Sequence, residues 1–427
     1  MPVFIVALLV FILWYSKKVY KSYFSHLSIF VGVNAGAIIL MYGCSIIDSS
    51  LSSTTWVCIW VMFGGFLLGS LVGKYKFSLC KKYNGKEQIC KISNIARLRK
   101  LIIVYSIVYN IFAFYYFFRL NSYYGIGRMF VDMSGINLAF QNGDFTLGIS
   151  SYFTPIGIPL SLMILYYIKK VKGNSLLYIQ YALCYIQCIS PRRDNLFFMI
   201  VMTLLFIVSQ NYKNIKLSNR TKKNVKRVVI VFVIFVVAVW IMSFTQNLMN
   251  KSSSVDFTVF GFKVPEFMKD ACLYAAGNYP YLDRMLQIND LNISFPLIAT
   301  LRLFYRYICG PLGFEIDTVT PFDLDFLNIG TSGSLTFNTA PILYYFIIEA
   351  GVFFVFIVFV MGFLSKKADD VLRNSESIGL IMLALMQFDI ILFSFRSYNL
   401  LYLSYILAIF YMLIAHIYID VDYKKKE

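Results

Sequence analysis

Charge is scarce in this sequence: charged residues make up 14% of its 427 residues. Soluble proteins average about 25%. Hydrophobic residues make up 59% and the mean hydropathy is +0.68. Because apolar runs of this abundance are stable only in a lipid bilayer, a soluble enzyme is excluded. The composition predicts an all-α polytopic membrane protein.

Groups that usually carry catalysis or bind metal are scarce as well. The two histidines, His26 and His416, lie at predicted cytoplasmic helix ends, so no outer-face histidine is available as a base. The eight cysteines have no metal-site spacing, and a lone Asp323-x-Asp325 pair is a weak metal signal. We therefore expect no metal and no cofactor. Cys272 and Cys309 are the only predicted outer cysteines, and the sequence leaves open whether they form a disulfide.

Long apolar runs are abundant. A membrane-spanning helix needs about 20 apolar residues. We predict about 11 transmembrane helices, of which the first, sixth and seventh are short: Pro2–Tyr15, Leu27–Ile47, Thr55–Val72, Leu101–Phe118, Tyr152–Ile168, Leu176–Ile189, Leu196–Val208, Val228–Phe244, Ala340–Leu364, Ile378–Phe395 and Leu400–Ile419. The first run has its lysines after it and no Ala-x-Ala end, so we expect a retained anchor and not a cleaved signal peptide.

The formal net charge of +17 reflects orientation in the membrane. Alternate loops hold 28 of the 39 basic residues, and basic residues accumulate on the cytoplasmic side. This asymmetry predicts a cytoplasmic C-terminus and an outer N-terminus, and it argues against a nucleic-acid partner.

Loop lengths divide the chain into three parts. Residues 1–244 hold eight spans with an outer loop at 119–151, residues 245–339 form a large outer loop, and residues 340–427 hold the last three spans and the tail. Loops this long are usually functional or disordered. Amphipathic stretches at Tyr279–Ile288 and Phe295–Ile308 predict two or three short helices lying on the outer interface. We expect this loop to be a binding or catalytic lid.

The kind of basic residue differs between the two faces. Lysine outnumbers arginine 23 to 5 inside, whereas arginine outnumbers lysine 8 to 3 outside. The planar guanidinium group suits bidentate phosphate contacts. The outer arginines therefore predict an anionic ligand that carries phosphate, although pairing with outer carboxylates or lipid phosphates would also explain individual ones.

Arg192 and Arg193 lie in the turn Ser190-Pro191-Arg192-Arg193-Asp194 between two short spans of 14 and 13 residues. Helices of that length rise about 20 Å, less than the roughly 30 Å of the hydrocarbon core. The arginine pair should then be sunken and face a cavity. Alternatively, the helices extend further and the turn is solvated.

Four other arginines and one acid are candidates. Arg302 and Arg306 share one helix face at i, i+4 and could hold a pyrophosphate, while Arg284 could join them or pair with an acid. Arg396 ends the tenth span, above the intramembrane Asp389. Glu349 lies near the outer end of the ninth span and could be a general base, a sugar-binding carboxylate or an acid paired with an arginine.

Glycines repeat every four residues in the second and third spans, at Gly32/Gly36 and Gly65/Gly69/Gly73. Small residues at this spacing let helix backbones approach closely. We expect these two spans to pack against each other.

Three local features resemble the O-antigen polymerases, the Wzy-type oligosaccharide repeat unit polymerases of bacteria. The Ser190–Arg193 turn resembles the family's Ser-Gly-x-Arg turn, with Pro191 in place of glycine. Arg302 and Gly313 have the Arg-x10-Gly spacing of the family's outer loops. Phe337-Asn338-Thr339 followed by Glu349-Ala350-Gly351 resembles the Asn-x-Thr and acidic-x-Gly segment that opens a late span. The number of spans and the position of the large loop also match.

The resemblance implies a multi-pass protein of the bacterial inner membrane with its active face toward the periplasm. It implies a metal-independent, lipid-linked glycosyltransferase of the GT-C type, in which a glycan on undecaprenyl pyrophosphate is donor and one repeat unit on the same lipid is acceptor. Arg192, Arg193, Arg302 and Arg306, with Arg284 and Arg396, would bind the pyrophosphate. Glu349 or Asp194 would orient or deprotonate the acceptor. A chain-length regulator and other glycan assembly proteins are the implied partners.

Three alternatives stay open. One is a structural membrane scaffold, which would leave the excess of outer arginines and the sunken arginine pair unexplained. An O-antigen ligase has a similar architecture but is expected to use an outer histidine. A lipid-linked oligosaccharide flippase would have internal repeats and short loops on both sides. The sugars, the linkage and the chain length are not encoded in any motif.

Overall fold

The computed structural model describes residues 2–20, 22–74, 94–131, 135–136, 139, 146–171, 175–189, 194–212, 256–288, 297–298, 300–314, 324, 326–331, 333 and 335–420. The chain forms two compact units. The first comprises residues 1–77, 253–369 and 390–403, and the second comprises residues 78–252, 370–389 and 404–427.

The described residues are mostly helical and contain several helices that can cross a membrane. Seven are long and apolar enough: Pro2–Tyr20, His26–Gly43, Ser53–Gly73, Ile95–Met129, Ser150–Val171, Ile342–Asn374 and Leu403–Asp420. The predicted seventh and tenth spans correspond to the shorter apolar helices Asn195–Ser209 and Ile378–Leu392. The predicted sixth span is broken, and the predicted eighth span, Val228–Phe244, lies outside the described residues. This is the fold of an all-α, multi-pass membrane protein.

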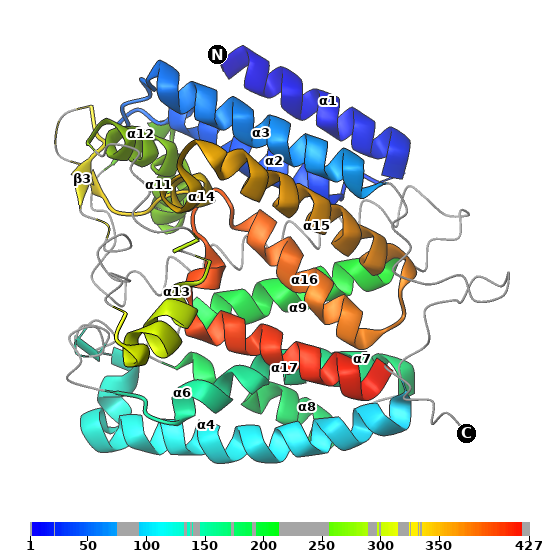
Figure 1. The fold of residues 1–427 in the computed structure, drawn as a ribbon. Helices are drawn as coiled ribbons and strands as arrows, with labels where there is room; N and C mark the ends of the chain where they lie inside the picture. The colour runs from blue at the N-terminus through cyan, green and yellow to red at the C-terminus, as the bar shows by residue number, and fades with distance from the viewer. Residues whose placement is uncertain are drawn as a thin grey trace, which may run out of the picture. The chain divides into compact units, whose positions relative to one another are not determined.

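Four long helices run side by side in the first unit, as Figure 1 shows: α1 (Pro2–Tyr20), α2 (His26–Gly43), α3 (Ser53–Gly73) and α15 (Phe354–Asn374). The predicted ninth span is not one helix. Its first part is α14 (Ile342–Ala350), which is joined to α15 through a single 3-10 turn, η8 (Gly351–Phe353). Gly351 has φ 53° and ψ −130°, a conformation that favours glycine, and it ends α14 two residues after Glu349.

The prediction that the glycines of the second and third spans face each other is wrong. A Cβ at Gly69 would lie 1.9 Å from the Phe359 carbonyl oxygen, and one at Gly362 would lie 2.2 Å from the Phe66 carbonyl oxygen. The glycines of α3 therefore let its backbone touch that of α15, not that of α2. A Cβ on Gly32 or Gly36 of α2 would meet no described atom within 4 Å.

The large outer loop holds two short antiparallel hairpins that the sequence did not predict. They are β1 (Thr258–Val259) with β2 (Phe262–Lys263), and β3 (Leu327–Asn328) with β4 (Thr336–Phe337). Both attach to the segment that follows α2, because Cys44 bridges Val259 and Ile47 bridges Gly330. This segment therefore fastens the loop to the end of a membrane helix.

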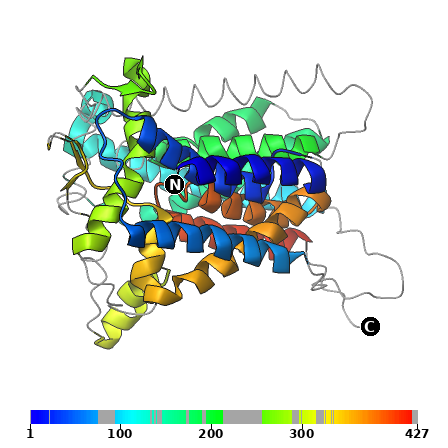
Figure 2. The same ribbon diagram turned by 90° about the horizontal axis from the view of Figure 1, so that it is seen from above.

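The helices of this loop are η4 (Glu266–Met268), α11 (Lys269–Ala276), α12 (Asn278–Ile288), α13 (Arg302–Phe304), the π-helical turn η5 (Tyr305–Cys309) and η6 (Gly310–Leu312). In Figure 2 the green α11 and α12 cross the blue helices at one end. The prediction of helices on the surface is wrong for the start of α12, where residues 278–283 are all buried.

Tyr279 shows how deep α12 begins. Its hydroxyl donates to Asn34 Oδ1 at 2.7 Å, and Asn34 lies nine residues before the end of α2, a rise of about 13 Å. Asn34 Nδ2 in turn donates to Ser394 Oγ at 2.7 Å. All three side chains are fully buried, so a polar chain joins the loop to the interior of the first unit.

The second unit contains α4 (Ile95–Val131), α6 (Ser150–Phe153), η1 (Thr154–Ile156), α7 (Gly157–Val171), α8 (Ser175–Leu183), η2 (Ile186–Cys188), α9 (Asp194–Tyr212) and α17 (Leu403–Asp420). The helix α16 (Ile378–Leu392) begins in this unit and ends in the first. α4 runs 13 residues past the predicted end of its span, with a kink at Gly125, φ 72°.

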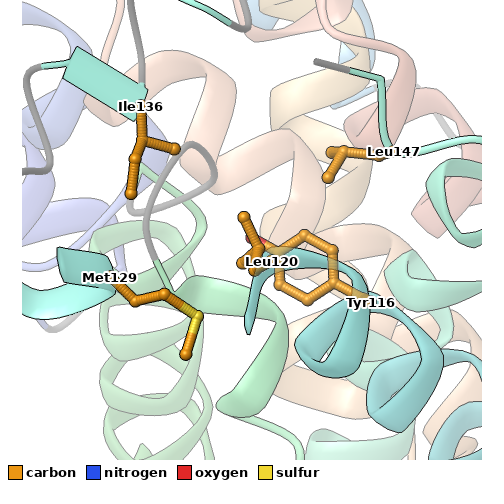
Figure 3. Packing of buried hydrophobic residues seen from close by; sticks show 5 residues of the cluster. All are labelled: Tyr116, Leu120, Met129, Ile136 and Leu147. Atoms are coloured by element: carbon orange, nitrogen blue, oxygen red, sulfur yellow. The ribbon is translucent and has the colours of Figure 1, made fainter. Parts of the chain in front are cut away.

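The kink in α4 starts a small outer core. Met129, beyond the kink, packs with Tyr116 and Leu120, before it, and with Ile136 and Leu147 (Figure 3). The partly buried Ile189 also packs here, and its carbonyl accepts a hydrogen bond from the Tyr116 hydroxyl. The described part of the predicted loop 119–151 is therefore folded.

Candidate functional site

The predicted arginine turn can be placed only by its neighbours. Arg192 and Arg193 lie outside the described residues, as does the side chain of Asp194. Before the turn, Ile189 belongs to the outer core of the second unit; after it, α9 begins at Asp194. α9 has 19 residues and rises about 28 Å, so it is longer than the predicted 13-residue span. The expectation of a sunken turn now depends only on the short, broken helix before it.

Arg302 and Arg306 belong to one continuous helical segment. Its first turn begins before α13, because Leu301 N donates to the Leu297 carbonyl at 2.8 Å and Tyr305 N to the Leu301 carbonyl at 3.0 Å. It ends at Gly313, whose φ of 87° places it in the left-handed region that favours glycine at a helix end. Gly313 of the Arg-x10-Gly spacing thus ends this segment, and Arg302 begins α13 within it. Arg302 is half-buried and Arg306 is exposed. We call residues 297–298 and 300–313 the arginine segment.

Glu349 is buried, with 1% of its surface exposed, and it contacts the start of the arginine segment. Its Oε1 accepts a hydrogen bond from Thr300 N. Its backbone carbonyl accepts a second one from Leu297 N at 3.3 Å. The structure therefore joins two predicted features that lie 49 residues apart.

Thr300 also joins the turn that contains Arg396. Its Oγ1 lies 2.7 Å from the Tyr398 hydroxyl oxygen. Tyr398 is 4% exposed, and its ring meets that of Phe346 edge-on at 5.4 Å. Two residues earlier, the Arg396 guanidinium lies over the Tyr274 ring, 4.8 Å from its centre. Arg396 is thus held against α11 by a cation–π contact.

The surroundings of these groups shift the pKa of two phenols. Burial raises the pKa of Tyr398, and the nearby negative charge of Glu349 raises it further. Burial also raises the pKa of Tyr305 in the arginine segment, followed by the effects of Cys309 and Glu349. Both phenols therefore stay neutral at pH 7. Arg302 lies within electrostatic range of Tyr345 in α14.

Arg284 belongs to a different network. Its Nη2 lies 3.0 Å from Asp48 Oδ2, in an ion pair with the segment after α2. The neighbouring Asp283 is buried, and its Oδ1 accepts hydrogen bonds from Ser52 N, Ser52 Oγ and Thr55 Oγ1 at 2.9, 2.6 and 2.6 Å. Of the two readings that the sequence left open for Arg284, the structure shows a pair with an acid, although that acid lies outside the loop.

The remaining candidates are the possible metal ligands, the outer cysteines and Asp389. No cluster of three or more His, Cys, Asp or Glu that could hold a metal occurs among the described residues, and Asp323 and Asp325 lie outside them. Cys272 and Cys309 are free thiols. Asp389, in the second unit, is fully buried.

Thr300, Tyr398 and Tyr274 were not among the residues singled out from the sequence. A threonine and two tyrosines are ordinary in a chain with 32 tyrosines, and no spacing relates positions 300, 349 and 398. The one feature of the sequence that could have pointed to Tyr398 is its position two residues after Arg396.

The chain was compared with known protein families, with curated proteins and with solved structures, and it matches none of them.

Proposed function

We propose that the protein is a lipid-linked glycosyltransferase that polymerises oligosaccharide repeat units carried on undecaprenyl pyrophosphate. The observation that carries this proposal is the convergence of the arginine segment, Glu349 and the Arg396 turn at Thr300. Three chain segments that meet in this way can surround one anionic group. The sequence resemblance to the repeat unit polymerases supplies the reaction.

In the proposed step, a hydroxyl oxygen of the acceptor sugar attacks the anomeric carbon of the donor glycan. A new carbon–oxygen bond forms, and the bond from that carbon to the pyrophosphate oxygen breaks. Undecaprenyl pyrophosphate leaves with the electron pair, and the acceptor proton goes to a carboxylate. The sequence predicts Asp194 or Glu349 for this role.

The arginines would stabilise the leaving group. Negative charge develops on the pyrophosphate as the bond breaks, and guanidinium groups held in place beforehand stabilise that charge without further reorganisation. Arg302, Arg306 and Arg396 supply such groups in the first unit. The sequence predicts the same role for Arg192 and Arg193, which lie outside the described residues.

The test is complementation of a strain from which the gene has been deleted, read as the ladder of envelope glycan on a gel. Arg302→Ala with Arg306→Ala should reduce polymer by at least about 100-fold, because removal of one such donor already costs about 10²–10³ in rate. Arg302→Lys with Arg306→Lys should recover only part of the activity, because lysine keeps the charge and loses the planar fork. Arg192→Ala with Arg193→Ala tests the predicted turn in the same way.

The matched control is Lys263→Ala, which removes another basic side chain of the outer loop, one whose exposure is 73%. Membrane levels of every variant must equal that of wild type. A deletion strain that still makes a full ladder contradicts the proposal. Loss of even the single capped unit points instead to a ligase or a flippase.

A further inference from the structure

The arginine segment is held at its start by contacts that the proposed reaction does not itself explain. Its first residue, Leu297, has φ 55°, an unusual conformation for a residue other than glycine. Such a conformation persists only where the surroundings fix it. The surroundings here are Glu349 and Tyr398.

Glu349 can bind this segment because α14 ends beside it. In a continuous helix the Glu349 carbonyl would accept a bond from residue 353, but the break at Gly351 removes that partner. The carbonyl accepts from Leu297 N instead, at 3.3 Å. The carboxylate of the same residue accepts from Thr300 N. One residue thus fixes two backbone amides at the start of the segment.

Tyr398 provides the third attachment. It binds the Thr300 hydroxyl at 2.7 Å, and it is itself held between the rings of Phe346, at 5.4 Å, and Tyr345, at 6.3 Å. Because α14 contributes both rings and Glu349, all three attachments hold the segment to the same helix. Arg396 is two residues from Tyr398, so its position relative to Arg302 depends on the same contacts.

We propose that Glu349, Thr300 and Tyr398 form a clamp that positions Arg302 and Arg306 relative to Arg396. This inference rests on the proposed function, and it changes one assignment within it. Glu349 acts through Thr300 and Leu297, so it is a positioning residue and not the general base. Asp194 is then the predicted carboxylate for the acceptor proton.

The clamp can be measured without any glycan, through Cys309. This thiol is half-buried in the arginine segment. In a Cys272→Ser background it is the only predicted outer cysteine, and Cys44, which the structure places beside the outer loop, is buried. The rate at which a membrane-impermeant maleimide labels Cys309 in spheroplasts reports how often the segment opens. Loss of a hydrogen bond to a charged group should raise that rate on the order of tenfold.

Glu349→Ala should raise the labelling rate by that factor and lower the yield of polymer. Glu349→Gln should leave both within about twofold of wild type, because the side-chain amide oxygen accepts the same bond from Thr300 N without charge and the backbone carbonyl that accepts from Leu297 N is unchanged. Thr300→Val and Tyr398→Phe should each raise the rate by a smaller factor. The double variant should be no worse than either single one, because both remove the same bond.

The matched control is Glu266→Ala, which removes a carboxylate of the outer loop that is 73% exposed. A Glu349→Gln variant that abolishes polymer while Cys309 labels at the wild-type rate would overturn the proposal and identify Glu349 as the base. An unchanged labelling rate in Glu349→Ala, in Thr300→Val and in Tyr398→Phe would overturn it too. Faster labelling in Glu349→Ala with full polymer from the Arg302/Arg306 variant would instead leave the clamp standing and reject the proposed function.

Discussion

Single side chains in this protein act mainly by joining segments that are far apart in the sequence. Asn34 is the clearest case in the interior, because its side chain accepts from Tyr279 and donates to Ser394. A buried polar group without a partner costs about 1–3 kcal/mol. Tyr279, Asn34 and Ser394 therefore depend on one another for hydrogen-bond partners.

We predict that Asn34→Ala destabilises the protein, because it leaves the buried Tyr279 hydroxyl without its acceptor. Tyr279→Phe removes that hydroxyl together with its need for a partner. The double variant should then unfold at a higher temperature than the sum of the two single effects implies, with a coupling of about 1–2 kcal/mol. The measurement is thermal unfolding of the detergent-solubilised protein. Strictly additive effects would show that the two residues do not depend on each other.

Two ion pairs around the exposed Asp256 in the outer loop respond to acid instead. Hydrogen bonds from Lys269 and Lys263 lower the pKa of Asp256 to about 2, from 3.8. A lowered carboxylate pKa stabilises the folded form above the unfolded pKa, and this contribution disappears as pH falls through the folded pKa. The stability that Asp256 gains from its two ion pairs is therefore complete at neutral pH and is lost only between about pH 4 and pH 2.

At the scale of elements, the most consequential feature is the break between α14 and α15. It frees the Glu349 carbonyl for the arginine segment, while α15 continues alongside α3. The first half of the predicted ninth span, α14, thus contributes Glu349 to the candidate site. Its second half, α15, packs against α3.

The contact between α3 and α15 gives a prediction of its own. Gly69→Ala places a methyl group 1.9 Å from a backbone oxygen, so the helices must separate, at a cost of about 1–3 kcal/mol. Gly36→Ala on α2 is the control, because its methyl group meets no described atom within 4 Å and alanine favours a helix by about 0.5–1 kcal/mol. The thermal midpoint should fall for Gly69→Ala and should not fall for Gly36→Ala. A fall of equal size in both would mean that α2 is packed as closely as α3.

At the scale of the molecule, the loop elements gather at one end of the helices in the first unit. The hairpins attach to residues 44–47 beyond the end of α2, whereas the buried His26, Ser70 and Asp369 cluster at the opposite ends of α2, α3 and α15. Alternate connections of this unit thus lie at opposite ends of its helices.

Cysteine labelling can test the orientation itself. Phe262→Cys, at a position 79% exposed in β2, should react with a membrane-impermeant maleimide in intact spheroplasts. Asn374→Cys, exposed at the end of α15, should react only after the membrane is permeabilised. Both variants need Cys80, Cys90, Cys272 and Cys309 replaced by serine. The reverse pattern would place the proposed site in the cytoplasm and rule out a periplasmic reaction.

Composition and the lengths of the apolar runs predicted the class of protein and the positions of several membrane helices. Apolar runs of sufficient length form helices in a membrane because each helix satisfies its own backbone hydrogen bonds. For the same reason the residues that form α2, α3, α4, α15 and α17 could be found from composition. Gly313 ends its helical segment through local geometry alone, because its left-handed backbone conformation favours glycine.

Tertiary structure decided what the sequence left open. Gly69 meets α15 and not α2, α12 begins deep beside Asn34, and Glu349 meets Thr300 and, through it, Tyr398. In each case the partner lies far away in the chain, and no local pattern specifies it. Hydrophobic periodicity fixes a helix and its apolar faces, but the choice between several apolar neighbours depends on side-chain shape and on buried polar groups finding partners.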